Sequence, residues 1–314
     1  MINFRFHLAS LIAVFLALAV GVVMGSTVID RAIVDSLRNR IDTVERRADA
    51  QRSENARLQA EVQQLRGFVD AVAPWAVSGT LTNPAAVVAV RGIDDGQTRA
   101  QVTLLRQGGA GAPGILWLEP AWNLTDEAQT QALAEAVGSA ARTKAAVRRD
   151  GIAALAARLT AGPEGAGQPD VLARLMDAGF VAFEGVDGQG EDFVPATYPG
   201  PDASVLVLGG PSDEITVESF VRDLARALVD RSEAPVVGEV FAEVEDGESR
   251  GEWLAPIRDD AALAPSLSTV DDVDLTEGRV ASVLALSDAA RGVFGAYGYG
   301  SRANQPLPVP PASG

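Results

Sequence analysis

The chain has 314 residues, of which 26 are basic and 42 are acidic, and it contains one His and no Cys. The absence of Cys excludes disulfides, thiolate metal sites and cysteine nucleophiles, and a single His excludes any site that needs two imidazoles. The formal net charge of −16 argues against a nucleic-acid surface, because such surfaces are basic. With 47% apolar and 22% charged residues, the composition predicts a chain that folds around a core.

An uncharged stretch runs from Leu8 to Ile29, after a short N-terminal tail of residues 1–7. As a helix it would be roughly 33 Å long, which is enough to cross a hydrocarbon core of about 30 Å. We therefore predict a transmembrane helix over residues 8–29, in contact with membrane lipid. A cleaved signal peptide is the alternative, although its apolar region is normally shorter than this one.

Small residues recur at every fourth position of this predicted helix, at Ala13, Ala17, Gly21 and Gly25. They share one helix face, and such a face lets two helices approach closely enough to pack in lipid. We predict that these four residues mediate transmembrane packing. The flanking charges do not settle the orientation of the helix, because the Arg residues that follow it are interleaved with Asp and Glu.

A heptad repeat occupies residues 30–73. Apolar side chains recur at alternating spacings of three and four from Val34 onward, which predicts a coiled-coil stalk. β-Branched residues at a positions and Leu at several d positions favour a parallel homodimer, in which Asn55 at an a position fixes the register. The predicted interface consists of Val34, Leu37, Ile41, Val44, Asn55, Leu58, Val62, Leu65 and Val69. The alternative is one amphipathic helix that lies on its own domain, and Pro74 is expected to end the helix.

From about residue 80, short apolar runs alternate with amphipathic stretches. The runs predicted as strands are Ala85–Val90, Ile115–Leu118, Phe180–Phe183, Val205–Leu208 and Pro235–Val240. The stretches predicted as helices are 97–107, 126–141, 151–160, 169–178, 216–230 and 277–290. Continuous apolar runs are typical of parallel strands buried on both faces, so we predict a doubly wound, Rossmann-like α/β domain over residues 80–292. This domain carries the acidity of the chain, which suits a basic partner.

Two loops of this domain carry polar groups that bear on function. The turn Gly209–Asp213 follows a predicted strand, but both Gly-rich phosphate motifs are absent and Asp213 would repel phosphate, so a structural turn is favoured. Asp271, Asp272 and Asp274 form a carboxylate cluster of the kind that can hold Mg²⁺ or Ca²⁺. The EF-hand spacing is missing, which favours a solvated or helix-capping loop. We therefore predict no catalytic, cofactor-binding or metal-binding residue.

The end of the chain has a different composition. Glycines recur up to residue 300, and prolines recur from residue 306 onward. Such a segment buries little apolar surface, which is what a chain needs in order to offset the entropy of ordering. We predict a disordered tail over residues 293–314.

Several segments resemble one protein family over essentially the whole chain. They are FHLASLIAVFLALAVGVVMGS at Phe6–Ser26, STVDDVD at Ser268–Asp274, Gly278, and YGYGSRANQPLPVPP at Tyr297–Pro311. These segments resemble the mycobacterial copper-transport protein MctB family of actinobacteria. The resemblance implies a membrane-associated envelope protein that lowers intracellular copper, with its globular domain outside the cytoplasm. Corynebacterial relatives, called SteB, are linked instead to septal cell-wall division, which implies a cytoplasmic partner and a coiled-coil peptidoglycan hydrolase.

Two functions are therefore expected. The first is a membrane-anchored, dimeric cell-envelope protein that acts in copper export and homeostasis. The second is a scaffold for septal cell-wall division that binds an envelope or cell-division protein and has no copper chemistry of its own. In both cases we expect a single pass through the cell membrane, a homodimer and no nucleic-acid partner. We expect no enzyme, since the sole histidine, His7, lies beside the predicted transmembrane helix and a Ser–His–Asp triad is ruled out.

Overall fold

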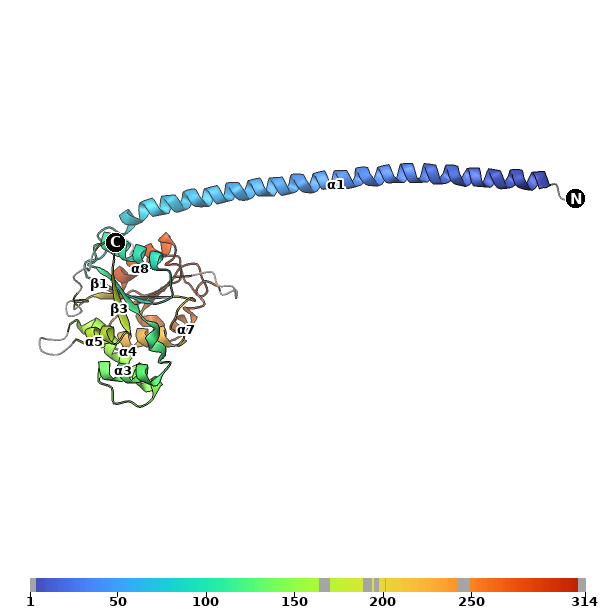
Figure 1. Cartoon of the computed structure of the whole chain (residues 1–314). Helices are drawn as coiled ribbons and strands as arrows, with labels where there is room; N and C mark the ends of the chain where they lie inside the picture. The colour runs from blue at the N-terminus through green and yellow to red at the C-terminus, as the bar shows by residue number, and fades with distance from the viewer. Residues whose placement is uncertain are drawn as a thin grey trace. The chain divides into compact units, whose positions relative to one another are not determined.

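The structure of the chain, a computed structural model, describes residues 4–163, 170–188, 194, 198–200, 202–241 and 249–309, and only the backbone of residues 26–33 (Figure 1). By its internal contacts the chain divides into two units, Met1–Arg66 and Gly67–Gly314. The helices are α1 (Phe4–Val77), α2 (Asp95–Gln107), α3 (Glu127–Val137), α4 (Lys144–Ala161), α5 (Val171–Asp177), α6 (Phe220–Val229), α7 (Ala255–Arg258) and α8 (Thr276–Ala289), with 3₁₀ turns η1 (Pro120–Asn123) and η3 (Ala264–Ser266). The strands are β1 (Ala85–Val90), β2 (Gly114–Leu118), β3 (Val181–Gly185), β4 (Ser204–Gly209), β5 (Val236–Glu239), β6 (Ser268–Val270) and β7 (Ala296–Tyr297).

Helix α1 contains both the predicted transmembrane segment and the heptad repeat. Its first part, Phe4–Gly25, is long and apolar enough to cross a membrane, a test that a signal sequence also passes. The prediction that Pro74 ends the helix is wrong, because Pro74 lies inside α1. A proline removes only its own N–H, and the turn that follows is stabilised by Ala73 and Val77, which are buried in the core of the second unit.

The second unit contains one seven-stranded sheet with the strand order β3-β2-β1-β4-β5-β6-β7. All neighbouring strands are parallel except β2 and β3, which run antiparallel. From β1 the chain first builds outward through β2 and β3, and then returns to place β4 on the other side of β1. This reversal is the topological switch point of a doubly wound α/β fold, as the sequence predicted.

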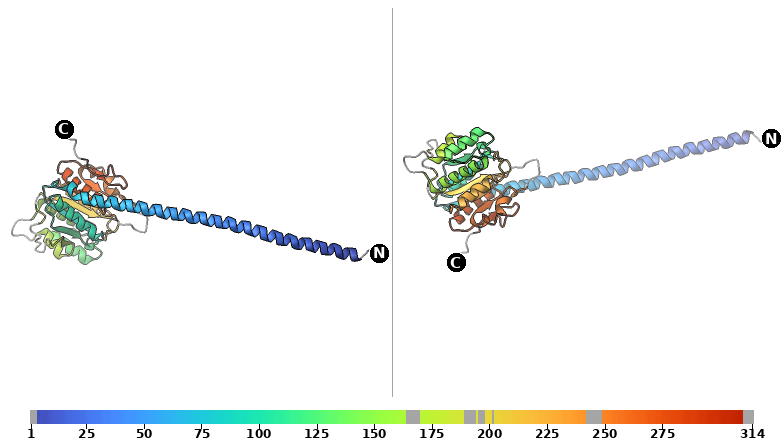
Figure 2. Two further views of the ribbon diagram at one scale, coloured as in Figure 1. Left: turned by 90° about the horizontal axis from the view of Figure 1, so that it is seen from above. Right: turned by 90° about the horizontal axis from the view of Figure 1, so that it is seen from below.

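Helices cover both faces of the sheet (Figure 2). Helices α3, α4, α5 and α6 pack together on one face, whereas α2 and α8 pack on the other face beside the end of α1. Side chains alternate between the two cores along each strand: Val88 and Val90 of β1 face the first layer, and Val87 and Ala89 face the second. This alternation explains why the central strands read as continuous apolar runs.

Most predicted helices and strands lie within a few residues of those observed, but the region around residue 140 differs. The predicted helix 126–141 ends at Val137, because Gly138 adopts a left-handed φ of +69° that closes the helix. The next helix begins at Lys144 rather than near residue 151. Its first turn is capped by the Thr143 hydroxyl, which accepts the N–H of Ala146 at 3.3 Å.

Strands β3 and β6 differ from the prediction. The run Phe180–Phe183 was expected to form a buried parallel strand, but β3 is an antiparallel edge strand that is only partly buried. Its Glu184 accepts the indole N–H of Trp117 at 2.9 Å, a contact that the apolar run does not reveal. Strand β6 was not predicted, because its buried residues Ser268 and Thr269 are polar and break the apolar pattern.

The prediction of a disordered tail from residue 293 is wrong for part of that segment. Ala296 and Tyr297 form β7, which pairs in parallel with β6, and Tyr297 is buried. The backbone of this segment is held by side chains from elsewhere in the unit, which composition alone does not show. The last five residues, 310–314, lie outside the described residues.

Candidate functional site at the carboxyl edge of the sheet

The switch point between β1 and β4 is the place where doubly wound folds bind ligands. A cleft of 440 Å³ lies there, lined by the ends of both strands, by the start of α6 and by the segment before α7. Its lining includes Val90, Gly210, Asp213, Phe220 and Trp253. The position makes this cleft the first candidate for a ligand site.

The chain itself fills the part of the crevice nearest the strand ends. A Cβ on Gly209 would lie 2.4 Å from Cζ2 of Trp253, so the indole ring rests directly on the backbone at the end of β4. A Cβ on Gly210 would lie 2.4 Å from the carbonyl oxygen of Val240, so this glycine also packs against backbone. Both glycines are thus explained by close packing rather than by space for a ligand.

The turn after β4 holds a buried carboxyl group. Oδ1 of Asp213 accepts the N–H of Gly210 at 2.9 Å. Burial raises the pKa of Asp213 to about 8. The Asp213 carboxyl already accepts the backbone N–H that a phosphate would use. Helix α6 begins only at Phe220, so the turn does not lie at the N-terminus of a helix. The geometry agrees with the structural turn that the sequence favours at Gly209–Asp213.

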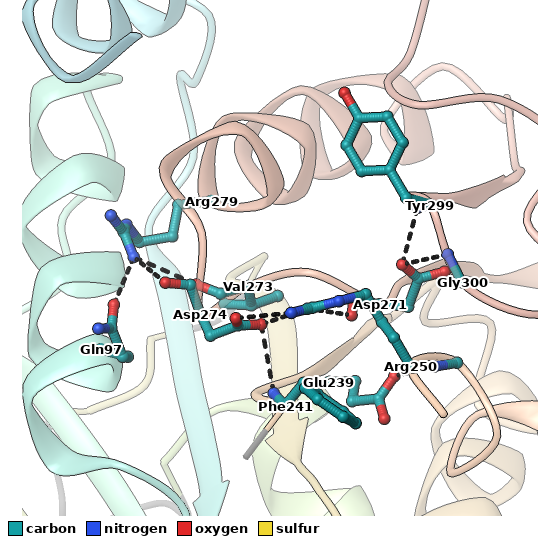
Figure 3. Close-up of polar contacts among 11 residues, drawn as sticks. Gln97, Glu239, Phe241, Arg250, Asp271, Val273, Asp274, Arg279, Tyr299 and Gly300 are labelled. Atoms are coloured by element: carbon teal, nitrogen blue, oxygen red, sulfur yellow. Dashed lines mark hydrogen bonds and ion pairs between the residues drawn. The ribbon is translucent and has the colours of Figure 1, made fainter. Parts of the chain in front are cut away.

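A second polar cluster lies at the ends of β5 and β6 (Figure 3). Asp271 accepts the backbone N–H groups of Tyr299 and Gly300 at its Oδ1, at 2.9 and 3.0 Å, and it accepts Arg258 at its Oδ2, at 2.9 Å. Asp274 binds both terminal nitrogens of Arg250, at 2.5 and 2.9 Å. The predicted carboxylate cluster therefore exists, and two of its members are paired with arginines. The expected solvated or helix-capping loop is wrong, because Asp271 and Asp272 are fully buried and no described side chain caps α8.

The third member of the cluster, Asp272, is different. It is fully buried, and neither of its carboxylate oxygens has a hydrogen-bond partner among the residues that the structure describes. Burial, followed by the charge of Asp271, raises the pKa of Asp272 to about 7. Nearby Glu239 accepts the N–H of Gly251 at 2.7 Å, and burial raises the pKa of Glu239 to about 8. Both groups therefore favour the neutral acid inside the fold.

These paired side chains occupy the carboxyl ends of β5 and β6. Within the described part of the chain, no group of three or more His, Asp or Glu side chains is disposed to hold a metal ion. Arg258 also donates to the carbonyls of Tyr297 and Ser301, at 2.9 and 2.6 Å. The paired carboxylates and arginines thus fasten the C-terminal segment to the sheet.

The two segments that carry the family resemblance in the second unit meet at this cluster. Gly298 adopts a φ of +117°, and a Cβ on it would lie 2.1 Å from Oδ1 of Asp271. Gly278 at the start of α8 would place a Cβ 2.0 Å from the carbonyl oxygen of Asp272. The motifs STVDDVD and YGYGS therefore fit each other sterically, and each glycine is required by the neighbouring aspartate.

The sequence-predicted interface residues lie on α1. Eight of the nine predicted coiled-coil residues have exposed side chains, and the ninth, Val69, is half-buried. Within the helix, Gln51 donates its side-chain amide to Oδ1 of Asn55 at 3.1 Å. Of the four predicted transmembrane packing residues, Ala13, Ala17 and Gly21 are exposed and Gly25 is half-exposed, and nothing lies within 4 Å of a Cβ built on Gly21 or Gly25. Both faces are free to bind a further helix.

Comparison with known proteins identifies the family. The chain matches the family described as "Copper transport outer membrane protein, MctB" over residues 1–308. The chain belongs to the MctB family. Proteins named copper transporter MctB from Mycobacterium bovis, Mycobacterium tuberculosis and Mycobacterium leprae are each 28% identical to it, over 96% of this chain and 97% of their own length. The expected family membership is confirmed over nearly the full length.

The sequence predicted the aspartate cluster and the glycine turn, but it did not predict the side chains that pair with the aspartates and pack on the glycines. Arg258 and Trp253 lie in a segment without a clear periodic pattern, and Glu239 lies within a run read only as a strand. An acidic residue inside an apolar run was a usable signal, because a buried carboxyl at a strand end needs a partner. The pairing of Arg258 with Asp271 had no comparable signal.

Proposed function

We propose that this protein is a membrane-anchored, dimeric component of the cell envelope that acts in copper export and homeostasis. The observation that carries the proposal is the MctB family match over residues 1–308, together with relatives named as copper transporters. The apolar segment Phe4–Gly25 serves as a single-pass anchor, and the second unit lies outside the cytoplasm. Residues 34–72 pair with those of a second copy as a parallel coiled coil.

The side chains of this protein include few of the ligand types that bind copper tightly. Copper(I) prefers thiolate or thioether ligands, and copper(II) prefers imidazole. The sequence has no Cys and one His, and of its three Met residues, Met24 lies in the apolar segment and Met176 on α5. We therefore propose that the protein affects copper export without a high-affinity copper centre, and that the α/β unit has no catalytic role. The packing of Trp253 against the end of β4, in the part of the crevice nearest the strand ends, supports the latter proposal.

The test measures cellular copper and copper binding together. Deleting the gene should raise the copper content of cells grown in added copper, and the intact gene should restore the original content. Titration of copper(I) into the purified full chain should show no stoichiometric tight binding. An unchanged copper content in the deletion strain would overturn the role in copper export. Stoichiometric tight binding would overturn the absence of a copper centre.

A second proposal is a scaffold for septal cell-wall division. The observation that favours it is the long exposed apolar stripe of α1, which includes Leu37, Ile41 and Val44. Partner capture from envelope extracts should disappear when residues 34–72 are replaced by an unrelated dimeric coil of equal length. That replacement keeps the anchor, the dimer and the α/β unit, so loss of a partner reports recognition by the stalk. Retained capture of every partner would contradict the scaffold.

A further inference from the structure

The last two heptads of α1 present an apolar stripe that lies beside the predicted a/d seam. Phe68 is 66% exposed and Trp75 is 83% exposed, and Val72 between them is also exposed. In the heptad numbering these are g, d and g positions. Large aromatic side chains are rarely left in water when a core could bury them. We therefore expect another polypeptide to cover this stripe.

The g positions change character along the helix. From the start of the stalk they are Arg40, Arg47, Glu54 and Glu61, and then Phe68 and Trp75. Charged g residues flank an a/d seam and remain solvated, whereas apolar residues at g and d together form a seam of their own. The change from charge to aromatic side chains occurs in one step between residues 61 and 68. It indicates that the contact surface moves from a/d to d/g at this point.

The second unit itself explains why the seam has to move. Ala73 and Val77 are buried in its core, and Val69 at the last a position is half-buried. On the same side of the helix, Asp70 accepts the hydroxyl of Thr276 at the start of α8. Val69, Ala73 and Val77, at a, e and b positions of this stretch, thus pack toward the chain's own α/β unit. The large apolar side chains that remain exposed here, Phe68, Val72 and Trp75, lie at d and g positions.

We propose that Phe68, Val72 and Trp75 form a d/g seam with the same residues of a second copy, which extends the proposed coiled-coil dimer to the base of the α/β unit. The inference rests on the dimer proposed above. A second copy is the occupant because Leu65 and Val72 continue the d positions of the same repeat without a break. Two copies anchored in one membrane through Phe4–Gly25 also run parallel, which brings equal positions together.

The seam makes a specific geometric prediction. In a parallel pair, residues at seam positions face their own equivalents, whereas flanking positions do not. Phe68 should therefore lie against the partner's Phe68, and Trp75 against the partner's Trp75. Val69 should point to its own α/β unit and away from the partner helix. A continued a/d seam would give the opposite result for Val69 and Trp75.

Single cysteines test this arrangement, since the natural chain has none. The full chain in detergent carries one of four substitutions, Ile41→Cys, Val69→Cys, Phe68→Cys or Trp75→Cys, and is treated with a mild thiol oxidant. Phe68→Cys and Trp75→Cys should form disulfide-linked dimers about tenfold faster than Val69→Cys, because only seam positions approach each other. Arg47→Cys is the matched control for a g position outside the new seam, and Val293→Cys on the exposed surface reports random collision.

The outcomes separate this inference from the dimer on which it rests. Cross-linking at Ile41 without faster cross-linking at Phe68 and Trp75 would overturn the d/g seam and leave the stalk dimer intact. Rapid cross-linking at Val69 would also overturn it, because the a/d seam would then continue. Failure at Ile41 together with cross-linking at Trp75 would overturn the stalk dimer and support this surface. Cross-linking at none of the four positions would overturn both.

Discussion

Replacing Arg258 with Met should destabilise the α/β unit strongly. The guanidinium of Arg258 is 3% exposed and the carboxylate of Asp271 is fully buried, and the two groups lie 2.9 Å apart. Arg258 also bonds Oγ1 of Thr269 and two carbonyls of the C-terminal segment. Breaking a buried pair from one side costs about 3–5 kcal/mol, because the remaining charge stays buried without its partner. Met keeps the apolar stem, so the effect reports the lost charge and hydrogen bonds.

The assay is urea unfolding of the full chain in detergent, followed by tryptophan fluorescence, to which the buried Trp117 and Trp122 contribute. The matched control is Arg302→Met, whose pair with Asp259 is 47% and 56% exposed and should contribute less than about 1 kcal/mol. Arg258→Met should also expose the segment after Tyr297 to protease. If both variants lose the same free energy of unfolding, the account of the closed sheet edge is refuted.

Three further predictions concern the stalk, the anchor and the buried acids. Asn55→Val should stabilise the coil but allow mixed oligomers by sedimentation, and a pure dimer would show that Asn55 does not specify the oligomer. Gly21→Leu with Gly25→Leu should weaken helix association in a membrane reporter, and an unchanged signal would remove these residues from the interface. Burial raises the pKa of Asp272 from 3.8 to about 7 and that of Glu239 from 4.5 to about 8, so the folded chain binds more protons than the unfolded chain. Its stability should therefore fall as the pH rises from about 4 to about 8, and Asp272→Asn should reduce that fall by roughly 2–4 kcal/mol; an unchanged slope would contradict the buried neutral acid.

The sequence predicted the five strands from β3 to β5 in the sheet order and missed β6 and β7 at the far edge. β1 and β4 are buried on both faces, so their apolar runs are long and unbroken. At the edge formed by β6 and β7 the pattern fails for physical reasons. β6 buries Ser268 and Thr269, whose hydroxyls are satisfied by neighbours that sequence does not place beside them, and β7 is two residues long. Short polar strands of this kind depend on tertiary contacts rather than on local pattern.

The site shows the same division between local and tertiary information. The sequence showed that Asp271, Asp272 and Asp274 form a cluster, but it did not show that Asp271 holds the C-terminal segment against the sheet. That attachment depends on Arg258 and on the backbone amides of Tyr299 and Gly300, which come from other parts of the chain. The high glycine and proline content of the last segment suggested disorder, but Gly298 allows close packing against Asp271. Composition indicates how much apolar surface a segment can bury by itself, whereas this segment is held by hydrogen bonds to Asp271 and Arg258.

The most direct test of the account is the mass of the full-length chain in detergent, measured by light scattering with the detergent contribution subtracted. The proposed anchor, stalk and d/g seam all predict twice the mass of one chain, independent of protein concentration in the micromolar range. A mass of one chain would contradict the dimer and with it the assignment of the heptad repeat. The same preparation, analysed by mass spectrometry, should retain the residues of the N-terminal helix.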